Sequence, residues 1–238
     1  MKNSLWVLFA AFSVSSLISC DKEKLIEGNG NPTTETRIIQ NFNTLILKMD
    51  YNVTIIQDSL EMVEVYAESN LIRYIDTYVS GKDLVIREKN SYKIDYNVPV
   101  VITVHTTQVE YIDLLGSGMI ETGNLNTPLL DIDILGSGTI EAYCNTDKLS
   151  VNISGSGYAN IVGYSDEAYY RTSGSGHIQA YNMFAENCHA KISGSGNIYL
   201  YAVNYLNVSI SGSGSVFYKG NPLLDSSITG SGTIIHVP

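Results

Sequence analysis

Cysteine, histidine and proline are scarce in this chain of 238 residues, which has three cysteines, four histidines and five prolines. The cysteines form no Cys-x-x-Cys pair, and no histidine and cysteine have the spacing of zinc ligands. The sequence therefore predicts no metal and no cofactor.

Charge is also sparse, and positive charge is the scarcer kind. Only 16% of the residues are charged, with 14 basic and 24 acidic side chains, so the formal net charge is −10. An acidic chain is repelled by nucleic acid and by anionic lipid headgroups, so neither is expected as a partner. Low charge together with 17 tyrosines suits a protein that works outside the cytoplasm.

After residue 20, no apolar run is long enough to cross a bilayer as a helix. Residues 1–20 have a basic start, an apolar centre and the ending Leu17-Ile18-Ser19-Cys20. This pattern is typical of a secretory signal peptide, and its ending resembles the lipobox of bacterial lipoproteins. The resemblance implies cleavage before Cys20 and a lipid anchor on that residue. A plain signal peptide with a chance cysteine is the alternative.

Glycine, by contrast, is concentrated in one motif. The tripeptide Gly-Ser-Gly occurs seven times, at steps of 20, 19, 19, 20, 18 and 18 residues, and takes 14 of the 20 glycines. A fixed period near 19 is typical of a solenoid, in which stacked coils bury one another. The glycines of the motif are Gly116, Gly118, Gly136, Gly138, Gly155, Gly157, Gly174, Gly176, Gly194, Gly196, Gly212, Gly214, Gly230 and Gly232.

Apolar and polar residues alternate around each triplet. The position two before the first glycine is aliphatic in six of seven repeats, and the position three before it is always polar. This period of two predicts half-buried strands. By this alternation, both glycines fall on positions that face inward and the serine on a position that faces outward. We therefore interpret the triplet as a tight corner, where an inward side chain would collide with the core.

The repeat length narrows the fold. Helical repeats of about 33 to 47 residues are excluded, and no acidic residue follows the triplets as a calcium-binding repeat would require. The sequence predicts an all-β, single-stranded, right-handed parallel β-helix with about 19 residues per coil.

The rest of the chain divides by composition. Residues 21–34 are polar, with two glycines and a proline, which predicts a flexible tether. Residues 35–109 alternate without the triplet and predict irregular coils that cover the first edge of the stack. Residues 110–238 hold the seven triplet coils. We expect one domain over residues 35–238, with an open coil edge at its end that a second copy could cover.

Three segments before the triplets have distinctive patterns, namely Phe42-x-x-Leu45-x-Leu47, Tyr51-Asn52-Val53-Thr54-Ile55-x-Gln57 and Gly81-Lys82-Asp83-Leu84-x-Ile86. Together with the triplet coils, these segments resemble the putative auto-transporter adhesin, head GIN domain family of Bacteroidota lipoproteins. The resemblance implies a β-helix like the pectin-lyase-like folds and a role in adhesion, and it brings no catalytic motif.

Aromatic residues of the last coils give the first candidate binding face. Tyr181, Tyr199, Tyr201 and Phe217 have outward parity on one sheet. Exposed aromatic patches bind sugar rings, proteins or a sister subunit. Tyrosine is also common in half-exposed strands, so an ordinary strand surface is the alternative.

A charged column gives the second candidate. Asp113 and Asp133 are stacked neighbours by the repeat, and Arg171 and Lys191 continue the same column. Parallel β-helices carry polysaccharide lyases and hydrolases that use such groups, but we favour the alternative that the column is a solvated outer face. The triplets match no phosphate-binding fingerprint.

Taken together, the sequence predicts a non-catalytic lipoprotein of the outer membrane or cell surface, which binds a glycan or a host or envelope protein. A carbohydrate-active enzyme and a structural envelope component are the alternatives. A homo-oligomer through the open coil edge or the aromatic face is a further expectation.

Overall fold

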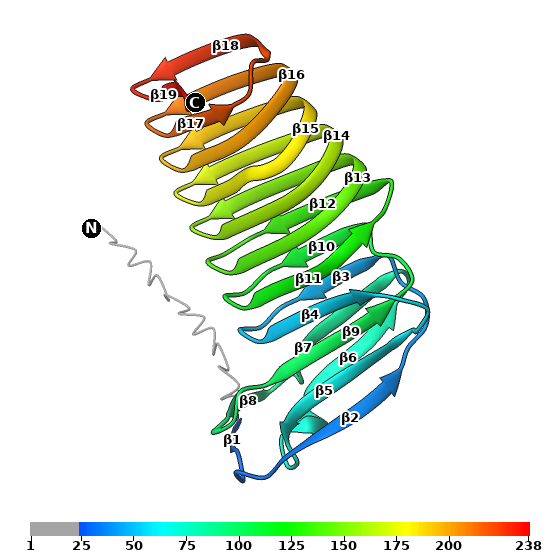
Figure 1. The fold of residues 1–238 in the computed structure, drawn as a ribbon. Coiled ribbons are helices and arrows are strands. Elements are labelled where there is room, and N and C mark those ends of the chain that lie inside the picture. Colours follow the sequence, from blue (N-terminus) through cyan, green and yellow to red (C-terminus); the bar gives the residue numbers. More distant parts are fainter. Residues whose placement is uncertain (1–23) are drawn as a thin grey trace, which may run out of the picture.

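The computed structural model describes residues 24–238, which form one elongated stack of β-strands (Figure 1). This part of the chain has no α-helix, and its one turn of 3-10 helix, η1, spans Ile72–Tyr74. The strands are β1 (Lys24–Glu27), β2 (Pro32–Ile38), β3 (Thr44–Leu47), β4 (Asn52–Gln57), β5 (Met62–Glu68), β6 (Ile75–Ser80), β7 (Asp83–Glu88), β8 (Tyr92–Asp95), β9 (Val101–Thr106), β10 (Tyr111–Leu114), β11 (Met119–Asn126), β12 (Leu129–Ile134), β13 (Thr139–Gly155), β14 (Tyr158–Gly174), β15 (His177–Gly194), β16 (Asn197–Gly212), β17 (Ser215–Lys219), β18 (Leu223–Gly230) and β19 (Thr233–His236).

Each coil contributes one strand before a tight corner and one strand after it. The strands before the corner are β3, β10, β12, β18 and the second halves of β13 to β16, and they pair in parallel. The strands after the corner are β4, β11, β17, β19 and the first halves of β13 to β16, also in parallel. We call these stacks the pre-corner sheet and the post-corner sheet. The predicted all-β parallel solenoid is confirmed.

The core lies between the two sheets and follows the predicted alternation. In β12, Leu130, Ile132 and Ile134 are fully buried, whereas Asp131 and Asp133 face outward. The register pairs Ile132 with Val151 of the next coil, so inward side chains stack on inward side chains. Each coil thus buries its apolar face against its neighbours.

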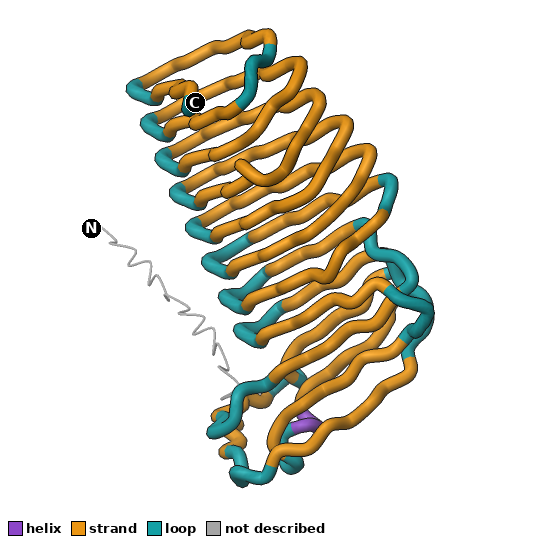
Figure 2. Tube along the Cα trace, viewed as in Figure 1, coloured by secondary structure: helices purple, strands orange, loops and turns teal. Residues whose placement is uncertain are grey.

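The Gly-Ser-Gly corners form one row along an edge of the solenoid (Figure 2). The carbonyl oxygen of Gly155 accepts bonds from the next coil's Ser175 and Gly176 backbone N–H groups, at 3.0 and 2.9 Å. A Cβ atom on Gly174 would lie 2.5 Å from that same oxygen, and Gly174 has a φ of +138°. A Cβ atom on Gly176 would lie 2.5 Å from Ile153 Cγ2 in the core. The predicted collision with the core therefore explains the second glycine, whereas the neighbouring backbone explains the first.

A second bend joins the two sheets within each coil, and its chemistry was not predicted. Thr127, Thr146 and Ser165 are buried there, and each hydroxyl donates to the carbonyl oxygen two residues later, at 3.0, 3.0 and 2.7 Å. A buried hydroxyl without a partner would cost about 1–3 kcal/mol, so these bonds are needed. The register places Ala185 and Ala202 at this position in the later coils.

The alternation predicts irregular coils over residues 35–109, but only part of this segment forms coils. Here β3, β4, β7 and β9 lie in parallel below the triplet coils. Strands β5 and β2 then extend the post-corner sheet in antiparallel order, and β6 extends the pre-corner sheet antiparallel to β7. Side chains alternate with a period of two in both kinds of sheet, so the pattern cannot distinguish them.

The described part of residues 21–34 also departs from the expected tether. Strand β1 pairs in parallel with β8, Ile26 packs against the core, and β2 begins at Pro32. The Gly28 N–H donates to the Asp95 carbonyl oxygen at 2.8 Å. The polar composition gave no sign of these strands because their partners lie far along the chain.

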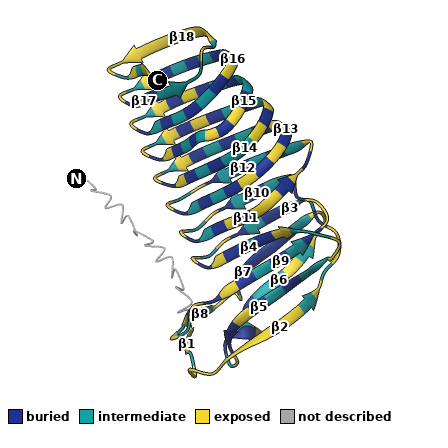
Figure 3. Ribbon diagram, in the orientation of Figure 1, coloured by how far each residue is buried: buried dark blue, intermediate teal, exposed yellow. Residues whose placement is uncertain are grey.

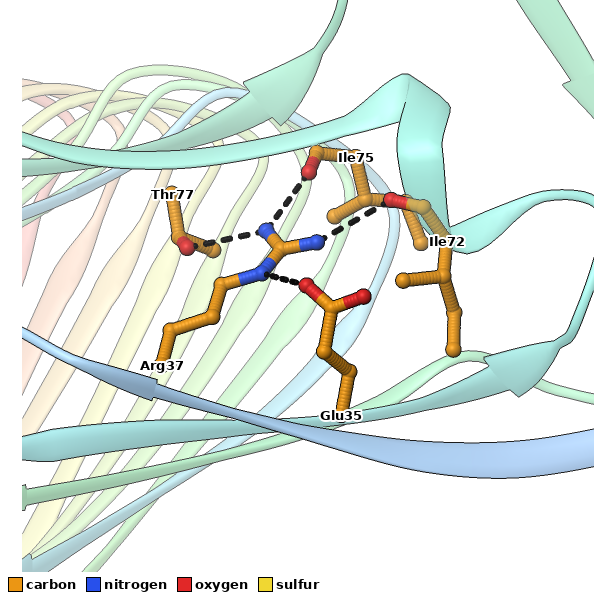
Figure 4. A network of polar contacts seen from close by, with 5 residues as sticks. All are labelled: Glu35, Arg37, Ile72, Ile75 and Thr77. Atoms are coloured by element: carbon orange, nitrogen blue, oxygen red, sulfur yellow. Dashed lines mark hydrogen bonds and ion pairs between the residues drawn. The ribbon is translucent and has the colours of Figure 1, made fainter.

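Arg37 joins the edges of the two sheets at this end of the stack (Figure 4). From β2 its guanidinium donates to the Ile75 carbonyl oxygen at 2.7 Å, to Thr77 Oγ1 at 2.9 Å and to the Ile72 carbonyl oxygen at 3.1 Å. Glu35 holds the same guanidinium in an ion pair of 2.6 Å. Since Ile75 and Thr77 belong to β6, these bonds join β2 to β6, the outermost strands of the two sheets at the N-terminal end.

Glu68 is fully buried at the same end and accepts four bonds. The donors are the backbone N–H groups of Gly30, Asn97 and Val98 and the side-chain amide of Asn97. Burial by itself raises the pKa of the Glu68 carboxyl, but the N–H bonds led by that of Gly30 outweigh burial, so the pKa is lowered. Glu68 therefore ties the N-terminal segment to β5 and to the segment before β9.

The opposite end is left uncovered by the residues that the structure describes. All eight residues of β18 are exposed (Figure 3). Ile228 is 44% exposed, although its register partner Ile210 is 2% exposed. The last coil thus keeps the apolar pattern of its neighbours without a further coil to cover it.

The predicted signal peptide and Cys20 lie outside the described residues. Within residues 24–238, no helix has the length and apolar character to cross a membrane.

Candidate functional site

Three of the four predicted aromatic residues lie together on the outside of the post-corner sheet. The rings of Tyr199 and Phe217 stack with centroids 4.8 Å apart, and Tyr181 meets Tyr199 edge-on at 5.6 Å. Lys219 Nζ lies 4.8 Å from the centroid of the Tyr181 ring. Desolvation raises the pKa of the Tyr181 hydroxyl, so this group stays a neutral hydrogen-bond donor.

Tyr201 lies in a neighbouring column with an aromatic residue that was not predicted. Its ring centroid is 4.8 Å from that of Phe184, which is 48% exposed. Strand β15 shifts register against β16 between Ala180 and Phe184, which turns Met183 inward and Phe184 outward. A strict period of two places Met183 outside and Phe184 inside, so the sequence pattern predicts Phe184 to be buried. We call Tyr181, Phe184, Tyr199, Tyr201 and Phe217 the aromatic strip.

A groove of about 580 Å³ lies on the outside of the pre-corner sheet. On one side, Tyr169 and His189 stand stacked, with centroids 4.7 Å apart and planes within 7° of parallel. The Tyr169 hydroxyl donates to Glu167 Oε2 at 2.5 Å, and this bond, with desolvation, raises its pKa. Lys148 Nζ lies 5.1 Å from the Tyr169 ring centroid. The remaining lining is mainly polar or charged and includes Asp131, Asn152, Arg171, Lys191, Asn207 and Ser209.

The predicted acidic pair lies beside this groove, on strands β10 and β12. Asp113 and Asp133 are register partners, and the same column continues through Asn152 to Arg171 and Lys191. Burial, and then the charge of Asp133, raises the pKa of Asp113. Burial is also the main cause of the raised pKa of Asp131.

The acids and bases of that column do not meet. Asp133 and Arg171 are two strands apart, which corresponds to about 10 Å at the usual spacing between strands. Within residues 24–238, no ion pair includes either group. The column therefore does not bring a carboxylate and a basic group into contact.

Neither cysteine of the described chain is poised for chemistry. Cys144 and Cys188 are free and buried, and desolvation raises the pKa of each thiol to about 12. A thiol at such a pKa is protonated at neutral pH and is a poor nucleophile. The same residues 24–238 contain no group of three or more histidine, cysteine, aspartate or glutamate side chains that could hold a metal ion.

These features define a class, namely β-solenoid proteins with a filled interior that present side chains on flat outer sheets. Within that class, residues 41–222 match the putative auto-transporter adhesin, head GIN domain family, and the chain belongs to this family. The resemblance seen in the sequence is therefore confirmed.

Solved structures from Bacteroidales have the same fold. A putative adhesin from Bacteroides fragilis is 25% identical with a TM-score of 0.82, and the match covers 89% of this chain and 100% of the other. A putative lipid binding protein from Parabacteroides distasonis is 28% identical with a TM-score of 0.77, covering 90% and 100%. A putative adhesin from Parabacteroides merdae, at 22% identity, TM-score 0.75 and coverage of 90% and 100%, shows the fold alone. Among curated proteins, none matches the chain.

Proposed function

We propose that the protein is a non-catalytic adhesin, anchored by lipid on Cys20 to the outer membrane, that binds glycan or protein through an outer face. The family and its structural relatives support an adhesion-type role at the cell surface. The observation that carries the proposal is the aromatic strip on the post-corner sheet.

The strip has the features of a binding face. Its five rings come from three successive coils and form two contacting groups, one of Tyr181, Tyr199 and Phe217 and one of Phe184 and Tyr201. Phe184 is 48% exposed and the other four are half-buried, so binding would remove apolar area from water without large rearrangement. Aromatic anchors held by their neighbours are typical of energetically important binding residues.

Binding of the full chain to immobilised glycans and extracellular-matrix proteins tests this function. The variant Tyr199→Ser/Phe217→Ser is expected to lose most binding to whichever ligand the wild type retains. Tyr158→Ser, which changes an exposed tyrosine elsewhere on the post-corner sheet, is the matched control and should bind as the wild type does. Equal binding by all three proteins would remove the aromatic strip as the adhesive face.

The lipid anchor has its own test. Cells that express the wild type or Cys20→Ser are grown with a labelled fatty acid. We expect label only in the wild type, and we expect Cys20→Ser to leave the membrane fraction. Labelling of Cys20→Ser would contradict the anchor.

A second candidate function is polysaccharide cleavage, favoured by the raised pKa of Asp113 beside the groove. New reducing or unsaturated ends from a polysaccharide panel, lost in Asp113→Asn, would support it. Activity retained by Asp113→Asn would exclude this residue as the acid.

A further inference from the structure

The groove on the pre-corner sheet concentrates positive charge in a chain with a net charge of −10. Arg171 and Lys191 are register partners on adjacent strands, and both are exposed. Like charges opposite each other on neighbouring strands repel. In residues 24–238 neither side chain forms an ion pair or a hydrogen bond with another residue. An anionic group from outside would relieve this repulsion.

The rest of the groove favours a ligand rich in hydroxyl groups. Asn152 donates to Asp131 Oδ1 at 3.4 Å and to Ser150 Oγ at 3.2 Å, and these long bonds leave hydrogen-bonding capacity free. The Asp131 carboxylate in the groove would repel a uniformly acidic peptide or a dense polyanion, but it can accept hydrogen bonds from sugar hydroxyls. The stacked Tyr169–His189 pair adds aromatic surface to the lining of the groove, against which a sugar ring can pack.

The dimensions agree with a short saccharide. A volume of about 580 Å³ lies within the range of about 300–1,000 Å³ that small-molecule sites occupy. Asp131 is two strand spacings from the row of Tyr169, which corresponds to about 10 Å. One ligand could therefore reach the cations at one end and the Asp131 carboxylate at the other.

We propose that this groove binds an acidic saccharide. The sugar carboxylate lies between Arg171 and Lys191, and neutral hydroxyls of the neighbouring sugars donate to Asp131 and bind Asn152. This inference goes beyond the proposed adhesive face, because the aromatic strip belongs to the post-corner sheet and shares no residue with the groove.

Isothermal titration of the full chain in detergent tests the groove with two trisaccharides that carry a single galacturonic or glucuronic acid and two neutral sugars, and with sialyllactose. We expect at least one of these to bind about tenfold more tightly than its own methyl ester, because the ester lacks the charge that the cations bind. Arg171→Gln/Lys191→Gln should weaken that binding about tenfold or more. Raised salt should weaken it as well.

Two matched variants separate the alternatives. Lys82→Gln/Lys89→Gln removes the same charge from exposed positions outside the groove, and it should change the affinity less than about twofold. Tyr199→Ser/Phe217→Ser should leave acidic-saccharide binding unchanged even if adhesion through the strip is lost. Thermal unfolding of each variant checks that the fold is intact.

The proposal is overturned if none of the three acidic sugars binds or if ester and acid bind equally. Equal weakening by the lysine control overturns it too, since general attraction would then explain the affinity. Equally tight binding of a triglutamate peptide would identify an acidic protein segment as the ligand class instead.

Discussion

The two ends of the solenoid differ in their outermost strands, which are the polar β2 at the N-terminal end and β18, with exposed apolar residues, at the C-terminal end. At the N-terminal end, Arg37 bonds the edges of the two sheets together, and buried Glu68 fixes the first segment. At the C-terminal end, Ile228 is 44% exposed above Ile210, which is 2% exposed. Both isoleucines stand two before a Gly-Ser-Gly triplet.

The difference teaches that burial in this fold comes from the neighbouring coil and not from the coil itself. A central coil has a neighbour on each side, whereas an end coil needs a different structure to replace the missing one. The N-terminal end has that structure in antiparallel β2, β5 and β6. An uncovered strand edge otherwise invites pairing with another chain.

The same glycine-to-alanine substitution in a middle coil and in the last coil should give the largest difference in the free energy of unfolding. Gly174→Ala forces a Cβ atom to within 2.5 Å of Gly155 O at a φ of +138°. Strain and overpacking together should cost about 3 kcal/mol or more. Gly230→Ala meets the Gly212 carbonyl oxygen at the same 2.5 Å and at a φ of +117°, but the last coil can shift into solvent, so we expect a smaller loss of about 1 kcal/mol. Urea unfolding measures both, and equal losses would show that the last coil is as constrained as the middle.

Arg37→Met removes the bonds that join the two sheet edges at the N-terminal end, which we call the closed end. It leaves the Ile72 and Ile75 carbonyl oxygens without their guanidinium partner, and we expect a loss of about 2 kcal/mol in the free energy of unfolding. Glu35→Gln removes only a half-exposed ion pair and should cost less than about 1 kcal/mol. If both variants lose the same amount in urea unfolding, the bonds across the edges do not stabilise this end.

Glu68 should make the closed end sensitive to acid. Its folded pKa is lowered, so its contribution is fully present above the unfolded value of 4.5 and is lost as pH falls below it. The difference in Tm between the wild type and Glu68→Gln should therefore be largest near pH 7 and shrink towards pH 3. A difference that stays constant or grows on acidification would contradict the lowered pKa.

A substitution in β18, at the uncovered C-terminal end, should have the smallest effect on the free energy of unfolding and a larger effect on association between chains. We expect the chain to self-associate through β18, and Ile228→Lys should favour the monomer while changing stability by less than about 0.5 kcal/mol. Ile38→Lys changes an isoleucine that is 83% exposed at the closed end, and it should leave association unchanged. Sedimentation that finds only monomer in the wild type, or dissociation by Ile38→Lys, would overturn this expectation.

The candidate sites differ in how far the sequence revealed them. Outward parity identified Tyr181, Tyr199 and Phe217 because their strands keep the period of two. Phe184 was missed because a bulge in β15 reverses parity, and nothing local marks the bulge. The column of Asp133, Arg171 and Lys191 was visible in the sequence, but the groove that Arg171 and Lys191 line also includes Tyr169 and His189, which the sequence did not single out.

The sequence by itself determined the solenoid, because the period of the triplets, the alternation of side chains and the corner glycines are all local and repeat in every coil. Only the tertiary structure decided the antiparallel end, the strands of residues 24–38, the Arg37 and Glu68 bonds and the groove. The bonds of Arg37 and Glu68 and the pairing of β1 with β8 join partners some 30 to 70 residues apart in the chain. Such pairings leave no periodic mark, because a single contact between distant segments has nothing to repeat.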